Sequence, residues 1–366
     1  MAQVNFSDSV TIDEAANIIP VISPTVEGED SHVTPIFLSE PGVGKTSILK
    51  MLKEKLGDEY DYIYVDCPSK DYMDIAATIP NHEAKALDQY IGSLFKMGNG
   101  HKKVIMLDEV FKVPKLMGVI WTRLMLERTV GDEPLPFGSM VFGTSNNASD
   151  GVGDSVQAHV GNRVALIPME KPNANKWNIW ASQNGVSSTI RAFVAMNPRV
   201  MASYKDGGQE DNPHIFNPAK PTQCVSFASP RSIFKLNRVV MNRDAIGHKA
   251  ADATIAGIVG LATQKALSVF IDMEKQLIPV KNIIADPEGV TMPQDVAALC
   301  MIMFNAVDAI QTQDELSSFM KFIKRMNQSE LQSIFFTMLM ANNRTTALAA
   351  RNDTIKEWTK DNYKYL

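Results

Sequence analysis

One short segment has the residue types that cradle a phosphate chain. Residues 39 to 47 read Ser-Glu-Pro-Gly-Val-Gly-Lys-Thr-Ser. Glycines at 42 and 44 let the backbone turn so that successive N–H groups face one anion. A lysine at 45 can reach the β- and γ-phosphates of a nucleotide, and the threonine hydroxyl at 46 can bind Mg²⁺. The predicted nucleotide-binding residues are Glu40, Pro41, Gly42, Val43, Gly44, Lys45, Thr46 and Ser47.

The elements on either side of this segment favour a phosphate loop. A strand is predicted over 34–38 and a helix over 46–56, and the amino end of such a helix adds a positive dipole. The strict pattern G-x-x-x-x-G-K-[ST] has glycine at its first position, where this chain has Ser39. The alternative is a glycine-rich turn that happens to precede Lys-Thr.

Two carboxylates follow an apolar strand some sixty residues later. Val104 to Leu107 leads directly into Asp108 and Glu109. Ligands of open α/β sheets bind at the carboxyl ends of the strands, so Asp108 is predicted to hold Mg²⁺ through water. Glu109 is predicted to orient the water that attacks the γ-phosphate. An Asp-Glu pair after a strand is also common as a helix cap, but its spacing from Lys45 favours the metal and water roles.

A third polar cluster follows the strand predicted over 140–143. The sequence there is Gly-Thr-Ser-Asn-Asn, from 143 to 147. Asn146 is the candidate to contact the same water or the γ-phosphate, with Thr144 and Asn147 as alternatives. The structural alternative is a turn rich in Asn and Ser.

Alternating strands and helices predict a parallel α/β sheet in the first half of the chain. Capping boxes begin helices at Thr11 with Glu14 and at Thr312 with Glu315. Pro20 and Pro24 are expected to end the first helix. The predicted strands are 34–38, 62–65, 104–107, 140–143 and 164–167, and the helices are 11–19, 46–56 and 115–127.

After about residue 170 only helical periodicity is found, apart from a Pro- and Gly-rich loop over 206–221. We therefore predict a nucleotide-binding core over 1–170 and a helical lid with further helices over 171–366. The helices predicted there are 177–183, 188–195, 231–242, 252–275, 294–310, 314–326, 329–341 and 344–360.

Composition limits the classes of partner. The chain has 366 residues and a formal net charge of −5, which argues against a broad nucleic-acid surface. Three separated cysteines, Cys67, Cys224 and Cys300, predict free thiols in a reducing compartment. No apolar run reaches the roughly 20 residues that span a bilayer, so no membrane contact and a cytoplasmic location are expected. Methionine is dense over 292–340, which fits either a helix core or an adaptable surface.

Further motifs give the sequence a resemblance to the AAA+ ATPases, and within them to the MoxR family. Glu109-Val-Phe-Lys-Val-Pro and the later Leu126-Glu-Arg-Thr-Val-Gly-Asp resemble the segment after the second nucleotide motif. Gly143-Thr-Ser-Asn resembles sensor 1. Gly161-Asn-Arg resembles the arginine-finger segment, with Val164 in place of Phe. Ser229-Pro-Arg resembles sensor 2. The resemblance covers roughly residues 30 to 270.

This resemblance implies roles that the residue types alone do not. Arg163 would enter the nucleotide site of a neighbouring subunit, and Arg231 would contact the γ-phosphate from the lid. The catalytic set would then be Glu109, Lys45, Asn146, Arg163 and Arg231. ATP and Mg²⁺ are the implied cofactors and a hexameric ring is the implied assembly. The implied client is a protein, in this family often one with a von Willebrand factor A domain. Each arginine could instead be an ordinary solvated residue, Arg163 after a loop and Arg231 at a helix start.

Two other functions remain open from the sequence. A DNA-directed AAA+ motor or loader would need a basic loop, for which His101-Lys-Lys is the candidate. A structural scaffold would bind ATP and hardly hydrolyse it, although Lys45, Asp108 and Glu109 argue against that function.

Overall fold

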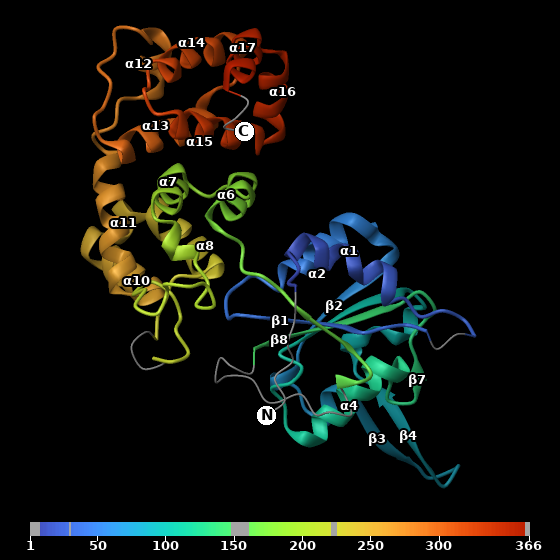
Figure 1. Ribbon diagram of the computed structural model, residues 1–366. Coiled ribbons are helices and arrows are strands. Elements are labelled where there is room, and N and C mark those ends of the chain that lie inside the picture. The colour runs from blue at the N-terminus through green and yellow to red at the C-terminus, as the bar shows by residue number, and fades with distance from the viewer. Residues whose placement is uncertain (1–7, 29–30, 148–160, 221–224, 363–366) are drawn as a thin grey trace. The chain divides into compact units, whose positions relative to one another are not determined.

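The chain divides into two compact units. A computed structural model of the protein describes residues 8–28, 31–147, 161–220 and 225–362. Met1–Lys171 forms the first unit and Pro172–Leu366 the second. Each unit has its own hydrophobic core, and each is described by itself (Figure 1).

The first unit is built on a sheet of five parallel strands among its described residues. Their order is β2-β5-β8-β1-β9, so β8 lies between the strand before the glycine loop and the strand that ends in the two acids. The strands are β1 (Pro35–Ser39), β2 (Tyr60–Asp66), β5 (Lys102–Asp108), β8 (Met140–Asn146) and β9 (Ala165–Pro168). All five strands predicted from the sequence are therefore present.

Both faces of this sheet are covered by helices, which explains the uninterrupted apolar runs in its central strands, such as Val104 to Leu107. On one face Leu107 packs with Trp121 of α4, and on the other Met106 packs with Leu52 of α2 (Figure 1). Successive side chains of a strand point to opposite faces, so Asp108 shares the face of Met106 and α2. The covering helices are α1 (Ile12–Ile22), α2 (Ser47–Leu56) and α4 (Lys115–Glu127).

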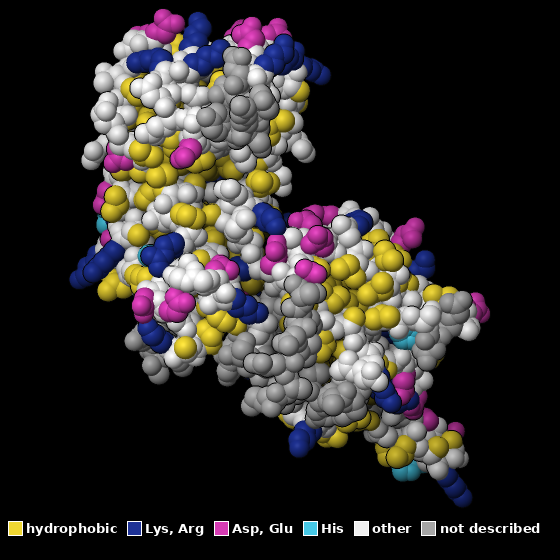
Figure 2. Space-filling model, viewed as in Figure 1, with side chains coloured by type: hydrophobic (Ala, Val, Ile, Leu, Met, Phe, Trp, Pro, Cys, Tyr) yellow, Lys and Arg dark blue, Asp and Glu magenta, His cyan; other side chains and the backbone are white. Residues whose placement is uncertain are grey.

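Two small hairpins in this unit were not predicted. The larger joins β3 (Ala76–Asn81) to β4 (Ala86–Ile91) and follows the short helix α3 (Tyr72–Ile75). It projects from the unit and carries both hydrophobic and charged side chains (Figures 1 and 2). Its base packs against Gly131, whose φ of 57° forms the turn between β6 (Thr129–Val130) and β7 (Glu133–Pro134). A side chain at 131 would collide with Gln89 and Ile91.

The second unit is all helical among its described residues, apart from turns and loops. The predicted fold class is therefore confirmed as an α/β core, with a parallel sheet between helices, followed by an all-α region. The helices are α6 (Ala174–Gln183), α7 (Ser188–Met196), α8 (Pro230–Met241), α9 (Arg243–Ile246), α10 (His248–Val259), α11 (Leu261–Glu274), α12 (Val280–Ala285), α13 (Val296–Ala309), α14 (Gln313–Lys324), α15 (Ser329–Met340), α16 (Asn343–Arg351) and α17 (Asp353–Asn362).

Three helix predictions were wrong in their boundaries. Pro20 does not end α1, because Ser23 still donates to the carbonyl of Ile19 and closes one more turn. The helix predicted over 252–275 is two helices, since Gly260 has a φ of 82° and would meet the carbonyl of residue 226 if it carried a Cβ. The one predicted over 344–360 is divided at Asn352, whose side chain accepts from the amide of Ile355. Both predicted capping boxes are present.

Sulfur-containing side chains in this unit fill the helix core. Cys300, Met301 and Met303 of α13 are each at most 1% exposed, so the methionines of this helix belong to the core. Cys300 and Cys67 are free thiols, and burial raises the pKa of Cys300 to about 12. Cys224 lies outside the described residues.

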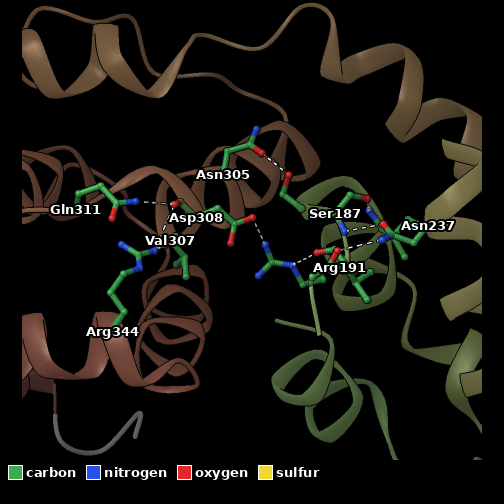
Figure 3. Close-up of polar contacts among 12 residues, drawn as sticks. Ser187, Arg191, Asn237, Asn305, Val307, Asp308, Gln311 and Arg344 are labelled. Atoms are coloured by element: carbon green, nitrogen blue, oxygen red, sulfur yellow. Dashed lines mark hydrogen bonds and ion pairs between the residues drawn. The ribbon is translucent and has the colours of Figure 1, made fainter. Parts of the chain in front are cut away.

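An ion pair between a buried arginine and a half-exposed aspartate connects α7 to the carboxyl end of α13. Arg191 is 1% exposed, and its guanidinium donates to the Asp308 carboxylate and to the carbonyl of Val186 (Figure 3). Arg344 of α16 reaches the same helix end, where it donates to the carbonyls of Val307 and Asp308 (Figure 3). These contacts join the carboxyl-terminal helices to the helices that precede them within this unit.

Removing Asp308 should destabilise the protein more than its exposure suggests. Asp308→Ala leaves the buried guanidinium of Arg191 without a counter-charge, and we expect a loss of about 3 kcal/mol in the free energy of unfolding. The double variant Arg191→Met/Asp308→Ala should recover part of that loss, because an apolar replacement of a buried pair is often tolerated. Urea unfolding of the full chain measures both.

The matched control is Asp353→Ala, which removes an aspartate that is 89% exposed and paired with Lys356. It should leave the unfolding midpoint nearly unchanged. If the losses in unfolding free energy of Asp308→Ala and of Arg191→Met alone simply added up to the loss of the double variant, the ion pair would not have the role assigned to it.

Candidate nucleotide-binding site

The glycine loop lies between the end of β1 and the start of α2. Gly42 and Gly44 have φ values of 78° and 107°, in the region where only glycine is relaxed. Thr46 precedes the helix, is exposed, and makes no side-chain capping bond. The first turn of α2 carries no acidic residue. The loop therefore has an accessible hydroxyl and a helix amino end that suit an anion.

Serine fits the first position of the motif without strain. Ser39 is the last residue of β1, where it pairs with Asn146 of β8 and is 1% exposed. Its φ is not positive, and the hydroxyl donates to the carbonyl of Glu40 at 3.2 Å. Because the left-handed turns come only at Gly42 and Gly44, the departure at 39 requires no conformation that serine disfavours.

A hydrogen-bonded chain links the loop lysine to the second acid. Nζ of Lys45 donates to Oδ1 of Asn146 at 2.6 Å and to the carbonyl of Ser145 at 3.0 Å. Nδ2 of Asn146 donates in turn to Oε1 of Glu109 at 2.7 Å. Lys45 is 4% and Asn146 8% exposed. Asn146, the first of the three candidates at the end of β8, thus touches both Lys45 and Glu109.

Glu109 has an unusual backbone and one unused oxygen. Its φ of 54° is left-handed, which is uncommon for a residue with a side chain. Hydrogen bonds from Val110 to the Thr144 carbonyl and from Lys112 to the Glu109 carbonyl hold this turn. Oε2 of Glu109 is buried without a hydrogen-bond partner among the described residues. A buried carboxylate oxygen without a donor is costly, so this atom is suited to accept from a water.

The first acid is held by the two strands beside it. Thr144 of β8 donates its hydroxyl to Oδ1 of Asp108, and Tyr64 of β2 donates to Oδ2 at 2.8 Å. Asp108 is 8% exposed. Sequence reasoning gave Thr144 only as an alternative to Asn146 and missed Tyr64. Nothing in the type of Tyr64 distinguishes it from Tyr60 and Tyr62 on the same strand.

These oxygens are compatible with Mg²⁺. Asp108 and Thr46 offer a carboxylate and a hydroxyl, the hard donors that Mg²⁺ selects. No cluster of three or more Asp, Glu, His or Cys side chains that could hold a metal occurs within the described ranges. A metal here would therefore need phosphate oxygens and waters as its other ligands, which is how Mg²⁺ binds with a nucleotide.

The two arginines implied by the family resemblance belong to different units of the chain. Arg163 is exposed and precedes β9, whose first residue pairs with Pro35 at the start of β1. The glycine loop follows the other end of β1, about 13 Å away along the strand. Arg163 thus lies at the amino-terminal ends of β1 and β9, whereas the glycine loop lies at the carboxyl-terminal end of β1. Arg231 is exposed in the first turn of α8, in the second unit.

The basic segment 101–103, which would suit DNA if it formed an exposed loop, lies mostly within β5. Lys103 is fully buried in β5 and bonds Asp61 at 2.8 Å, an interaction that lowers the pKa of Asp61 to about 2. Lys102, the first residue of β5, lies over the ring of Tyr60, the first residue of β2. On the face drawn in Figure 2, positive and negative side chains are interspersed.

Comparisons with known proteins add little to this geometry. No protein-family profile and no curated protein matches the chain. Among solved structures, a candidate ATPase from Cytophaga hutchinsonii aligns with 78% of this chain and 92% of its own, at 17% identity and a TM-score of 0.33. A point mutant of RuvB from Thermotoga maritima aligns with 78% of this chain and 79% of its own, at 13% identity and a TM-score of 0.34. At these values the likenesses carry no argument about function.

Within the described ranges no helix is both long enough and apolar enough to cross a membrane.

Proposed function

We propose that this chain is a Mg²⁺-dependent ATPase of the AAA+ kind, which works as a ring-forming oligomer and remodels a partner protein. The chain of contacts from Lys45 through Asn146 to Glu109 is the observation that supports this most. It joins a phosphate-binding cation, a polar sensor and a water-orienting carboxylate at the carboxyl ends of adjacent strands. Hydrolysis of a phosphate anhydride needs mainly such positioning and charge stabilisation.

Nucleotide binding would use the loop and the amino end of α2. Backbone amides between Gly42 and Thr46 would donate to phosphate oxygens, and Lys45 would exchange its present acceptors for phosphate oxygens. Thr46 and Asp108 would hold Mg²⁺. When bound, the metal neutralises negative charge on the phosphates. Asn146, released by Lys45, would keep its bond to Glu109 and be free to contact the γ-phosphate or the water.

In the reaction, a water oxygen bonds to the γ-phosphorus as the bond to the β-phosphate oxygen breaks. Oε2 of Glu109 would accept the hydrogen bond that aligns this water, since it has no other described partner. The left-handed backbone at Glu109 sets the direction of that side chain. The products are ADP and phosphate.

The site of one subunit would be completed by another. Arg163 is exposed and lies at the amino-terminal ends of β1 and β9, whereas its own glycine loop follows the carboxyl-terminal end of β1, which favours action in trans. Arg231, at the start of α8, would respond to loss of the γ-phosphate from the lid. By analogy with the MoxR family, the ring would be a hexamer and the client a protein, in some cases with a von Willebrand factor A domain.

Phosphate release from ATP, measured on the assembled full chain with and without DNA, tests this function. We expect turnover that is abolished by EDTA and unaffected by DNA. Strong stimulation by DNA would favour a DNA-directed motor instead. Nucleotide binding without turnover in the assembled state would favour a scaffold.

A further inference from the structure

Both oxygens of the Asp108 carboxylate are held by hydroxyl groups from the neighbouring strands. The Tyr64 hydroxyl donates to Oδ2 at 2.8 Å, and the Thr144 hydroxyl donates to Oδ1 from the other side. β2 and β8 flank β5 on its two sides, so the two donors come from opposite directions. If Asp108 only capped the turn that follows β5, it would not need hydroxyl donors from both neighbouring strands.

The strand register explains why Tyr64 is the tyrosine that reaches the acid. In β2, Tyr60, Tyr62 and Tyr64 point to the same face as Asp108, because side chains alternate along a strand. Tyr64 pairs with Met106, one same-face position before Asp108. The hydroxyl of Tyr62 donates instead to the carbonyl of Gly57 at 2.7 Å, away from the site.

The exposure of Tyr64 separates this role from core packing. The Tyr64 side chain is 44% exposed, whereas Ile63 and Val65 beside it are at most 3% exposed. Loss of its hydroxyl would therefore leave no cavity in the core. It would remove one of the two bonds that fix the orientation of Asp108.

An oriented carboxylate would matter here because Asp108 would contact Mg²⁺ through water. A carboxylate has about four acceptor positions, of which these two hydroxyls use two. The remaining positions can accept from metal-bound waters only if the group is held at one angle. Groups that orient a metal-binding side chain typically change metal affinity by about 10- to 100-fold when removed.

We propose that Tyr64 is a positioning residue which, together with Thr144, fixes Asp108 to receive the waters of a nucleotide-bound Mg²⁺ and so sets the Mg²⁺ concentration that the site requires. The proposal rests on the proposed ATPase function and deepens it. Tyr64 itself touches neither metal nor nucleotide in this assignment.

Binding of a fluorescent ATP analogue to the full chain, titrated with Mg²⁺ and repeated in EDTA, tests the proposal. In Tyr64→Phe we expect the Mg²⁺ concentration for half-maximal binding to rise about tenfold or more, while affinity in EDTA stays within about twofold of wild type. Thr144→Val should shift it in the same direction. The matched control is Tyr62→Phe, which removes a hydroxyl from the same face of the same strand and should shift nothing.

The possible outcomes distinguish failure of this proposal from failure of the ATPase proposal on which it rests. If Tyr64→Phe leaves the Mg²⁺ titration unchanged, or weakens binding equally in Mg²⁺ and in EDTA, the positioning role is refuted and the ATPase proposal stands. If wild type binds no nucleotide under any condition, the ATPase proposal fails and this one with it. A melting temperature of Tyr64→Phe equal to that of wild type in EDTA confirms that the fold is intact.

Discussion

Arg163→Ala is expected to lower ATP turnover by about 10³-fold or more in the assembled protein. An arginine that stabilises charge on the leaving phosphate from a neighbouring subunit contributes about 10³ to 10⁵ in rate. Arg163 is exposed and lies at the amino-terminal ends of β1 and β9, away from the glycine loop of its own chain, so its removal should leave nucleotide affinity and thermal stability nearly unchanged. Steady-state phosphate release, with oligomer mass measured in parallel, gives the comparison.

Mixing two inactive variants distinguishes action in trans from action in cis. An Arg163→Ala subunit retains Lys45, and a Lys45→Met subunit retains Arg163, so some neighbouring pairs in a mixed ring regain one complete site. We expect activity in the mixture that neither variant has alone. The control is Arg123→Ala, an exposed arginine already paired with Glu127 and Asp132 of its own chain, which should keep wild-type turnover. Absence of any recovery in mixed rings would rule out the assignment in trans.

Glu109→Gln should separate ATP binding from ATP hydrolysis. The amide keeps an oxygen that can accept from Asn146, but its nitrogen replaces Oε2, which has no partner among the described residues, and cannot accept the hydrogen bond that aligns the water. We expect the hydrolysis rate to fall by about 10²- to 10⁴-fold, the usual contribution of a positioned base, with ATP affinity retained. Single-turnover hydrolysis and equilibrium binding measure the two effects separately.

The same variant should hold the ATP-bound assembly together with its client. A pull-down with Glu109→Gln in ATP is therefore expected to retain partner proteins that wild type releases. Glu127→Gln is the matched control, because that carboxylate is 60% exposed and pairs only with Arg123 among the described contacts. Wild-type turnover in Glu109→Gln would contradict the role given to this carboxylate.

The sequence predicted the sheet of the first unit well, because strands buried on both faces contain uninterrupted apolar runs. Val104 to Leu107 could be assigned from this feature alone, and Asp108 and Glu109 followed as the first polar residues. The β3–β4 hairpin was missed for the opposite reason. It is short and largely exposed, so residues such as Leu87 and Tyr90 follow no core pattern.

The predicted helix boundaries were wrong where a single residue ends one helix and begins the next. Gly260 and Asn352 interrupt apolar periods that continue on both sides, so periodicity alone joins helices that the chain divides. Within the site, Lys45, Asp108 and Glu109 have types that suggest their chemistry. Tyr64 does not, because its contact with Asp108 depends on which strands are neighbours and on their register.

The central claim is that the loop from Ser39 to Thr46 holds a triphosphate beside Asp108, and calorimetric titration of ATP with Mg²⁺ tests it most directly. We predict saturable binding to wild type, and binding about ten- to a hundredfold weaker to Lys45→Met, because a charge-assisted hydrogen bond is lost. No saturable binding to wild type, or an equal affinity of the two proteins for ATP, would contradict the account.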